Sequence, residues 1–117
     1  MLKISTRRFG DITVVDAEGR VTASDGTSVQ LRTAFRDADE WSPKIVVNLA
    51  GVTYMDSSGI GELVRATTVR GRQVKILNPS IHLEKLLKVN KLDQYLEIHF
   101  DERAAINSFS RPTSGGQ

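Results

Sequence analysis

The chain has 117 residues, of which 39% are hydrophobic and 26% charged, values typical of one ordinary globular domain. It contains no cysteine, which excludes a disulfide scaffold and a thiolate metal site and favours a reducing, cytoplasmic location. The formal net charge is +2, aromatic residues are not interleaved with basic ones, and no apolar stretch reaches the roughly 20 residues that span a bilayer, so we expect neither nucleic-acid binding nor direct membrane insertion.

The first third of the chain predicts a β-hairpin followed by a helix. Apolar and polar residues alternate over residues 2–6, and Gly10-Asp11 suit a tight turn into a second strand over residues 12–17. A segment rich in helix-capping residues, 22–27, comes next. Helical spacing then relates Leu31, Ala34, Phe35 and Ala38.

The middle of the chain predicts a buried strand, a helix and another strand. Residues 45–49 form an unbroken apolar run after Pro43, a pattern typical of a strand buried on both faces. Gly71 is placed to end the following helix. That helix is expected to bury Ile60, Leu63, Val64 and Thr67. The next strand covers residues 74–77.

The last third predicts two helices and one strand. Asn78-Pro79 has the pattern of a cap followed by a first helical residue, and the helix should bury Leu83, Leu86 and Leu87. A fifth strand, 96–100, should place Leu96, Ile98 and Phe100 on one face, and Asp101 should cap a short helix through Phe109.

The element order β-β-α-β-α-β-α-β-α predicts an α/β fold with one mixed five-stranded sheet and helices packed on it. We expect a single domain over residues 1–110. Residues 111–117 offer nothing apolar to bury, so we expect a disordered tail there.

The segment Asp56-Ser57-Ser58-Gly59 is the most informative part of the sequence. It follows a buried strand and begins a helix, where backbone N–H groups favour oxygen-bearing or anionic groups. One side-chain oxygen suffices to cap a helix, yet three polar side chains are adjacent here. If Asp56 or, as we rather expect, Ser57 is the cap, then Ser58 lies in the first turn with an exposed hydroxyl and no structural duty.

Enzymatic and metal-binding functions find little support in the sequence. His82 and His99 lie 17 positions apart with no second ligand nearby, as expected for ordinary surface histidines. Neither serine lies in the Gly-x-Ser-x-Gly pattern of a nucleophile elbow, and the glycines do not form a phosphate-binding loop. We therefore expect no enzyme, no cofactor and no metal.

The same segment, with its flanks, resembles the signature of STAS domains, specifically the bacterial anti-sigma-factor antagonists. The similarity extends over about residues 2–109, and the residues that carry it best are Leu49-x-x-Val52-x-Tyr54-Met55-Asp56-Ser57-Ser58-Gly59-Ile60-Gly61. The resemblance implies that Ser58 is phosphorylated by an anti-sigma factor that is itself a serine kinase. The unmodified antagonist would bind that kinase and free a sigma factor, and a phosphoserine phosphatase would reset the switch.

The resemblance also implies a contact surface for the kinase. We expect it to include Asp56, Ser57, Ser58, Gly59, Ile60, Glu62 and Thr22. Thr22 and Asn48 replace acidic residues that many members of the family carry, and we expect both positions to lie near the motif.

The sequence leaves two kinds of protein open, each with its own assembly state. An antagonist would exist as a monomer or a homodimer. The alternative is a STAS scaffold in a large stress-sensing complex, or a separate subunit of a lipid or anion transport system.

Overall fold

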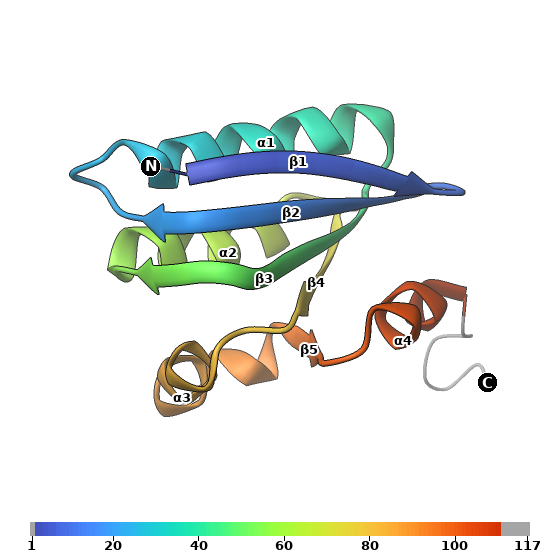
Figure 1. Ribbon diagram of the computed structural model, residues 1–117. Helices are drawn as coiled ribbons and strands as arrows, with labels where there is room; N and C mark the ends of the chain where they lie inside the picture. Colours follow the sequence, from blue (N-terminus) through green and yellow to red (C-terminus); the bar gives the residue numbers. More distant parts are fainter. Residues whose placement is uncertain (1, 111–117) are drawn as a thin grey trace.

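The computed structural model describes residues 2–110, so the expected tail, residues 111–117, lies outside the described residues (Figure 1). The elements are β1 (Leu2–Phe9), β2 (Ile12–Val21), α1 (Thr27–Trp41), β3 (Lys44–Met55), α2 (Ser57–Thr67), β4 (Gln73–Leu77), α3 (Ile81–Val89), η1 (Leu92–Gln94), β5 (Glu97–His99), α4 (Glu102–Asn107) and η2 (Ser108–Ser110).

The five strands form one mixed sheet, as the sequence predicts, and their order in the sheet is β1-β2-β3-β4-β5. β1 and β2 are antiparallel and are joined by a tight turn in which Gly10 has a φ of 61°. The other neighbouring strands are parallel, because a helical connection separates each strand from the next. β3 lies between β2 and β4, as expected.

The sheet is buried on both faces, but unequally. The larger core contains Ile45, Val47 and Leu49 of β3 together with apolar residues of α1, α2 and α3. The smaller core lies under α4 and contains Val46 and Ala105. Alternate residues of β3 therefore enter different cores, which confirms the prediction of a strand buried on both faces.

Some expected details are wrong. The N-cap of α3 is Ser80, not Asn78, because Asn78 adopts a positive φ of 54° and so bends the chain before the helix starts. β5 has only three residues, and Phe100 lies beyond its end with 58% of its surface exposed. Asp101 caps α4 as expected.

The inward face of α2 also differs from the expected one. It buries Gly59, Glu62, Leu63 and Ala66, whereas Ile60, Val64 and Thr67 are half-buried. Glu62 thus lies on the face of α2 that was expected to be apolar, because it forms an ion pair with Arg32 of α1.

The parallel arrangement of β2 and β3 positions the candidate site. Their carboxyl ends are paired, with Val21 opposite Met55, so the segment after β2 and the start of α2 meet at one edge of the sheet. Figure 1 shows these two strand ends side by side, with α2 beginning next to the loop that leads into α1.

Candidate functional site at the start of α2

Asp56 is the N-cap of α2. Its backbone is extended, and its Oδ1 atom accepts hydrogen bonds from the backbone N–H groups of Ser58, at 2.9 Å, and Gly59, at 3.2 Å. A carboxylate in this position satisfies orphan N–H groups of the first turn and favourably opposes the helix dipole. The expectation that Ser57 is the more suitable cap is therefore wrong.

The two serines have different environments. Ser57 is exposed, and no other residue between 2 and 110 forms a hydrogen bond with its side chain. Ser58 is half-buried, and its hydroxyl donates to Asp56 Oδ1 at 2.5 Å. The expectation that the Ser58 hydroxyl has no structural duty is also wrong, because the N-cap residue Asp56 accepts a hydrogen bond from that hydroxyl as well.

The carboxylate of Asp56 also joins α2 to the segment after β2. Its second oxygen, Oδ2, accepts a hydrogen bond from the backbone N–H of Ala23 at 3.1 Å. The Ser58 hydroxyl is the largest cause that lowers the pKa of Asp56, and the N–H groups of Ala23, Gly59 and Ser58 lower it further. Asp56 is thus a carboxylate at neutral pH that joins the Ser58 hydroxyl, the first turn of α2 and the segment after β2.

The side chain of Thr22 is buried in the loop after β2. It is 3% exposed, and its Oγ1 accepts a hydrogen bond from the backbone N–H of Asp25. Its own backbone N–H donates to Thr27 Oγ1 at 2.8 Å. Thr22 therefore shapes the loop that Asp56 contacts, and its contact with a partner stays a prediction.

Gly59 is buried where α2 passes closest to the sheet. A Cβ atom at this position would lie 2.5 Å from Met55 Cγ and 2.8 Å from Val21 Cγ1. Gly61, two positions later, has no atom within 4 Å of the corresponding place. Glycine at 59 thus permits close packing, and its role at the site is to let the first turn sit against the ends of β2 and β3.

Glu62 is buried as well, with 5% of its surface exposed. Its Oε2 atom accepts hydrogen bonds from Arg32 Nη2 at 2.6 Å and from Arg32 Nε at 3.0 Å. The pair ties α2 to α1. Glu62 therefore fixes, from a buried position, the helix that carries the site, and its contact with a partner stays a prediction.

Three residues that were not predicted to belong to the contact surface, Tyr54, Arg20 and His82, are exposed or partly exposed near the site. Tyr54, 46% exposed, lies at the end of β3 and stacks with Arg20, whose guanidinium is 4.8 Å from the ring centroid. Tyr54 and the exposed His82 line a small cavity of about 40 Å³ between β3 and α3. The parallel pairing of β2 and β3 could have revealed Arg20, since residues at the carboxyl ends of parallel strands lie together.

Asn48 lies away from the site, so the expectation of proximity is wrong. Its Nδ2 atom donates to Asp16 Oδ1 at 2.8 Å in the middle of the sheet. It precedes Met55 by seven positions on β3, which corresponds to about 23 Å along a strand.

Neither histidine lies in a metal site. His99 is largely covered and bonds Glu97 at 2.5 Å, whereas His82 is exposed in the first turn of α3. Among residues 2–110 no group of three or more His, Cys, Asp or Glu side chains could hold a metal ion. None of the helices described there has the length and apolar character to cross a membrane.

Three solved structures share the fold over almost their whole length. An anti-sigma factor antagonist from Mycobacterium paratuberculosis matches with a TM-score of 0.84 and 15% identity, over 95% of this chain and 96% of that one. A putative anti-sigma factor antagonist from Thermotoga maritima gives 0.82 and 17%, over 92% and 95%. The Bacillus cell fate determinant SpoIIAA in its phosphorylated form gives 0.66 and 21%, over 91% and 99%.

The sequence itself matches a family model described as "Mlab, STAS domain" over residues 4–98. This range runs from β1 to β5 and includes the whole Asp56-to-Gly59 segment. The chain therefore belongs to the STAS domain family.

Proposed function

We propose that this protein is an anti-sigma-factor antagonist that is switched by phosphorylation at Ser58. The observation that carries the proposal is the Ser58 hydroxyl, half-buried in the first turn of α2 and held by the Asp56 carboxylate. Two proteins of the same fold are described as an anti-sigma factor antagonist and a putative one, and a third is described in a phosphorylated form, which supports the proposal. The partner would be an anti-sigma factor with serine kinase activity, and a phosphoserine phosphatase would restore the unmodified state.

The position of Asp56 favours Ser58 over Ser57 as the acceptor. In the transfer, Ser58 Oγ forms a bond to the γ-phosphorus of ATP held by the kinase, and the bond to the bridging oxygen of the leaving ADP breaks. The hydroxyl proton must leave Oγ. Asp56 Oδ1 already accepts that proton in a hydrogen bond and so orients the attacking oxygen. Ser57 has no carboxylate partner of this kind among the described residues.

The surface around Ser58 suits a protein partner. It combines the exposed Ser57 and the half-buried Ile60 with the aromatic ring of Tyr54, flanked by Arg20. Tyrosine and arginine are enriched in protein interfaces, where they contribute large contact areas. Glu62 and Thr22 would act beneath this surface by holding α2 and the loop after β2.

Phosphorylation would release the partner through local electrostatics. A phosphoserine carries about −1.5 to −2 charges and has lost the proton that Ser58 donates to Asp56, so two anionic groups would face each other. Within a water-excluding interface such a charge is costly unless it is paired. A hundredfold to thousandfold loss of affinity requires only about 2.7 to 4.1 kcal/mol, so no rearrangement of the sheet is needed.

The acceptor can be identified with the partner kinase and ATP. We expect peptide mapping to find phosphate on Ser58 in the natural protein and in Ser57→Ala, and none in Ser58→Ala. Ser57→Ala is a matched control because it removes a neighbouring hydroxyl that makes no hydrogen bond to residues 2–110. Phosphate retained in Ser58→Ala and lost in Ser57→Ala would contradict the proposal.

A further inference from the structure

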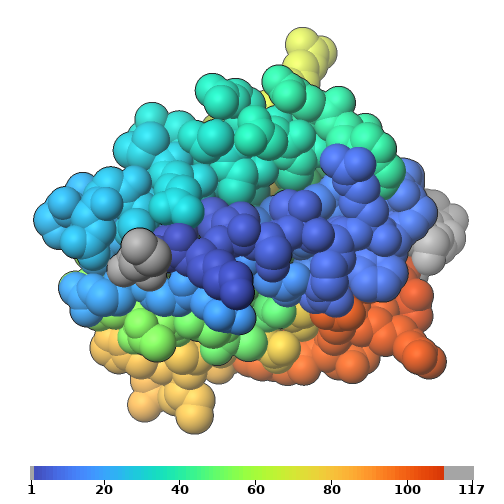
Figure 2. All heavy atoms as spheres, turned by 45° about the horizontal axis from the view of Figure 1, so that its top comes forward, coloured from blue at the N-terminus to red at the C-terminus, as the bar shows by residue number. Residues whose placement is uncertain are grey.

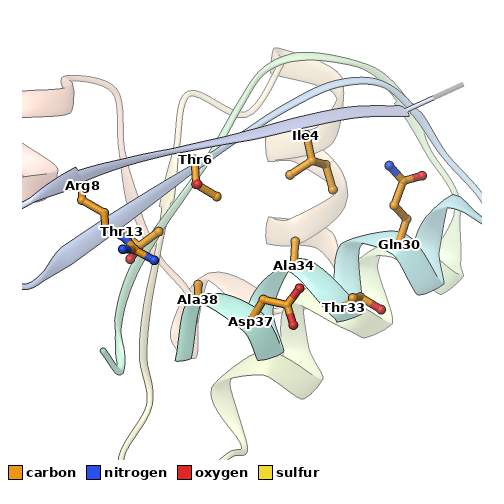
Figure 3. A pocket seen from close by; sticks show the side chains of 9 residues that line it. All are labelled: Ile4, Thr6, Arg8, Thr13, Gln30, Thr33, Ala34, Asp37 and Ala38. Carbon is orange, nitrogen blue, oxygen red and sulfur yellow. The ribbon is translucent and has the colours of Figure 1, made fainter. Parts of the chain in front are cut away.

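A second cavity lies along the edge strand β1 and helix α1, and its Arg8–Thr13 end is the end farther from Ser58. Its volume is about 310 Å³, at the lower end of the range for small-molecule sites. Figure 2 shows β1 lying open on the surface beside α1, and Figure 3 shows Ile4, Thr6 and Ala34 facing the space between them.

The floor of this cavity contains an unpaired polar group. Thr13 is 1% exposed, and its Oγ1 atom has no hydrogen-bond partner among the residues that the structure describes. A hydroxyl left in this state costs free energy, and buried polar groups in proteins are nearly always paired. No residue that the structure describes supplies the partner, and a molecule in the cavity would supply it.

The rim carries two charges that are poorly matched within the protein. Arg8 forms no ion pair with any described residue, and its guanidinium lies 4.3 Å from the centroid of the Trp41 ring. Asp37 has only a distant pairing, with Arg36 Nε at 3.8 Å, and both side chains are mainly exposed. The cavity therefore offers one cation and one anion to a ligand.

The arrangement of these groups indicates which end of a ligand each would take. Arg8 and Thr13 are directly paired across β1 and β2, so cation and buried hydroxyl belong to the same end of the cavity. In Figure 3, Ile4 and Ala34 lie beyond them along the cavity, and Asp37 lies on the α1 side. Arginine and a hydroxyl suit a carboxylate, Asp37 suits an ammonium group, and the two apolar side chains suit an aliphatic body.

We propose that this cavity binds a small zwitterion that carries a carboxylate and an ammonium group on an apolar body, of which an apolar α-amino acid is the simplest form. The carboxylate accepts hydrogen bonds from Arg8 and from Thr13 Oγ1, and the ammonium group pairs with Asp37. The site goes beyond the switch at Ser58 and is independent of it. Thr13 pairs with Ile45 on β3, ten positions before Met55, which corresponds to about 33 Å along a strand.

The test uses the full chain and L-leucine as the probe. Titration calorimetry should show saturable one-to-one binding. The fluorescence of Trp41, the single tryptophan, should also change, because the bound carboxylate pairs with the Arg8 guanidinium that lies over the Trp41 ring. N-acetyl-L-leucine lacks the ammonium group and L-leucinamide lacks the carboxylate. Each should bind about tenfold more weakly or worse, because each leaves a charged group of the protein unpaired.

Variants locate the binding. Thr13→Val keeps the shape of the side chain, removes the unpaired hydroxyl and should fold at least as stably as the natural protein, yet bind L-leucine about tenfold more weakly. Arg8→Gln and Asp37→Asn should weaken binding similarly. Lys3→Gln, a change of the same charge on the opposite face of β1, should not.

The outcomes separate this inference from the proposed function. Ser58→Glu should bind L-leucine as the natural protein does, and failure of the Ser58 switch would leave the cavity untouched. Absence of saturable L-leucine binding would overturn the inference. Binding with unchanged affinity in Thr13→Val and Arg8→Gln would also overturn it, since the ligand would then lie elsewhere.

Discussion

At the scale of single residues, the start of α2 depends on one carboxylate and one glycine. Asp56 accepts hydrogen bonds from Ser58, Gly59 and Ala23 and so determines how the Ser58 hydroxyl is presented. Gly59 lets the first turn approach Met55 and Val21. The helix cap Asp56, the closely packed Gly59 and the proposed acceptor Ser58 thus all lie within residues 56–59. A substitution near Ser58 must therefore be tested for its effect on folding as well as on function.

Gly59→Ala should destabilise the domain. The added methyl group would meet Met55 Cγ at 2.5 Å and Val21 Cγ1 at 2.8 Å, an overpacking that typically costs about 1–3 kcal/mol. Gly61→Ala is the matched control in the same helix, and there the added group meets open space. It should be neutral or stabilise by up to about 1 kcal/mol through helix propensity. Urea denaturation measures both, and equal effects of the two changes would contradict the packing described here.

At the scale of the elements, a chain of polar contacts joins three strands and α4. Arg7 of β1 donates to Asp16 of β2 at 2.6 Å and to Glu102 of α4 at 2.7 Å, and Asp16 also accepts from Asn48 of β3. The Arg7 side chain holds the pKa of Asp16 below its usual value of 3.8. The short helix α4 therefore gains a polar anchor beside its small apolar core.

This anchor predicts a pH dependence. Because the folded pKa of Asp16 is depressed, its contribution to stability is present above about pH 4 and is lost as pH falls through the folded value. Asp16→Asn should lower the free energy of unfolding by about 1 kcal/mol at pH 6, and the difference should shrink near pH 2.5. The control is Asp93→Asn, an exposed carboxylate with no ion pair among the described residues. A difference for Asp16→Asn that is constant with pH would contradict the ion pair.

The sequence predicts the elements better than it predicts their ends. Alternation and helical spacing identify every strand and every α-helix, although they miss the short helix η1, and the apolar run 45–49 identifies the central strand. The end of β5 and the start of α3 depend on tertiary contacts and on the positive φ of Asn78, which no local pattern reveals.

The site shows the same limit. The motif locates Ser58 and Asp56, but it does not reveal which oxygen caps the helix, since Asp and Ser cap equally well. It also does not reveal that Glu62 is buried, because a charged residue is expected at the surface unless its partner is known. That partner, Arg32, is 30 positions away on another helix.

At the scale of the whole molecule, two surfaces lie on the face of the sheet that α1, α2 and α3 cover. One lies at the carboxyl ends of β2 and β3 and carries Ser58 and Tyr54, and the other lies along β1 and α1 and carries Arg8 and Thr13. β1 is an edge strand that pairs only with β2. The two proposals therefore place a protein partner at the start of α2 and a small ligand between β1 and α1.

The assembly state separates an antagonist from a scaffold or transport subunit. With a chain mass of 12.9 kDa, we expect native mass spectrometry of the purified protein and of its complex to give a monomer or dimer bound to one kinase partner. The natural protein should recover that kinase from its own cells, whereas Ser58→Glu should not. A complex in the megadalton range, or recovery of membrane transport components, would instead favour the scaffold or the transport subunit.

The most direct test of the Ser58 switch is titration calorimetry with the partner kinase. The samples are the unmodified protein, the protein phosphorylated on Ser58, Ser58→Ala and the control Ser57→Glu, each with a circular dichroism spectrum to verify the fold. We predict that phosphorylation of Ser58 weakens binding by about a hundredfold or more, whereas Ser58→Ala binds like the unmodified protein and no longer responds to ATP. Equal affinity of the phosphorylated and unmodified proteins would contradict the switch.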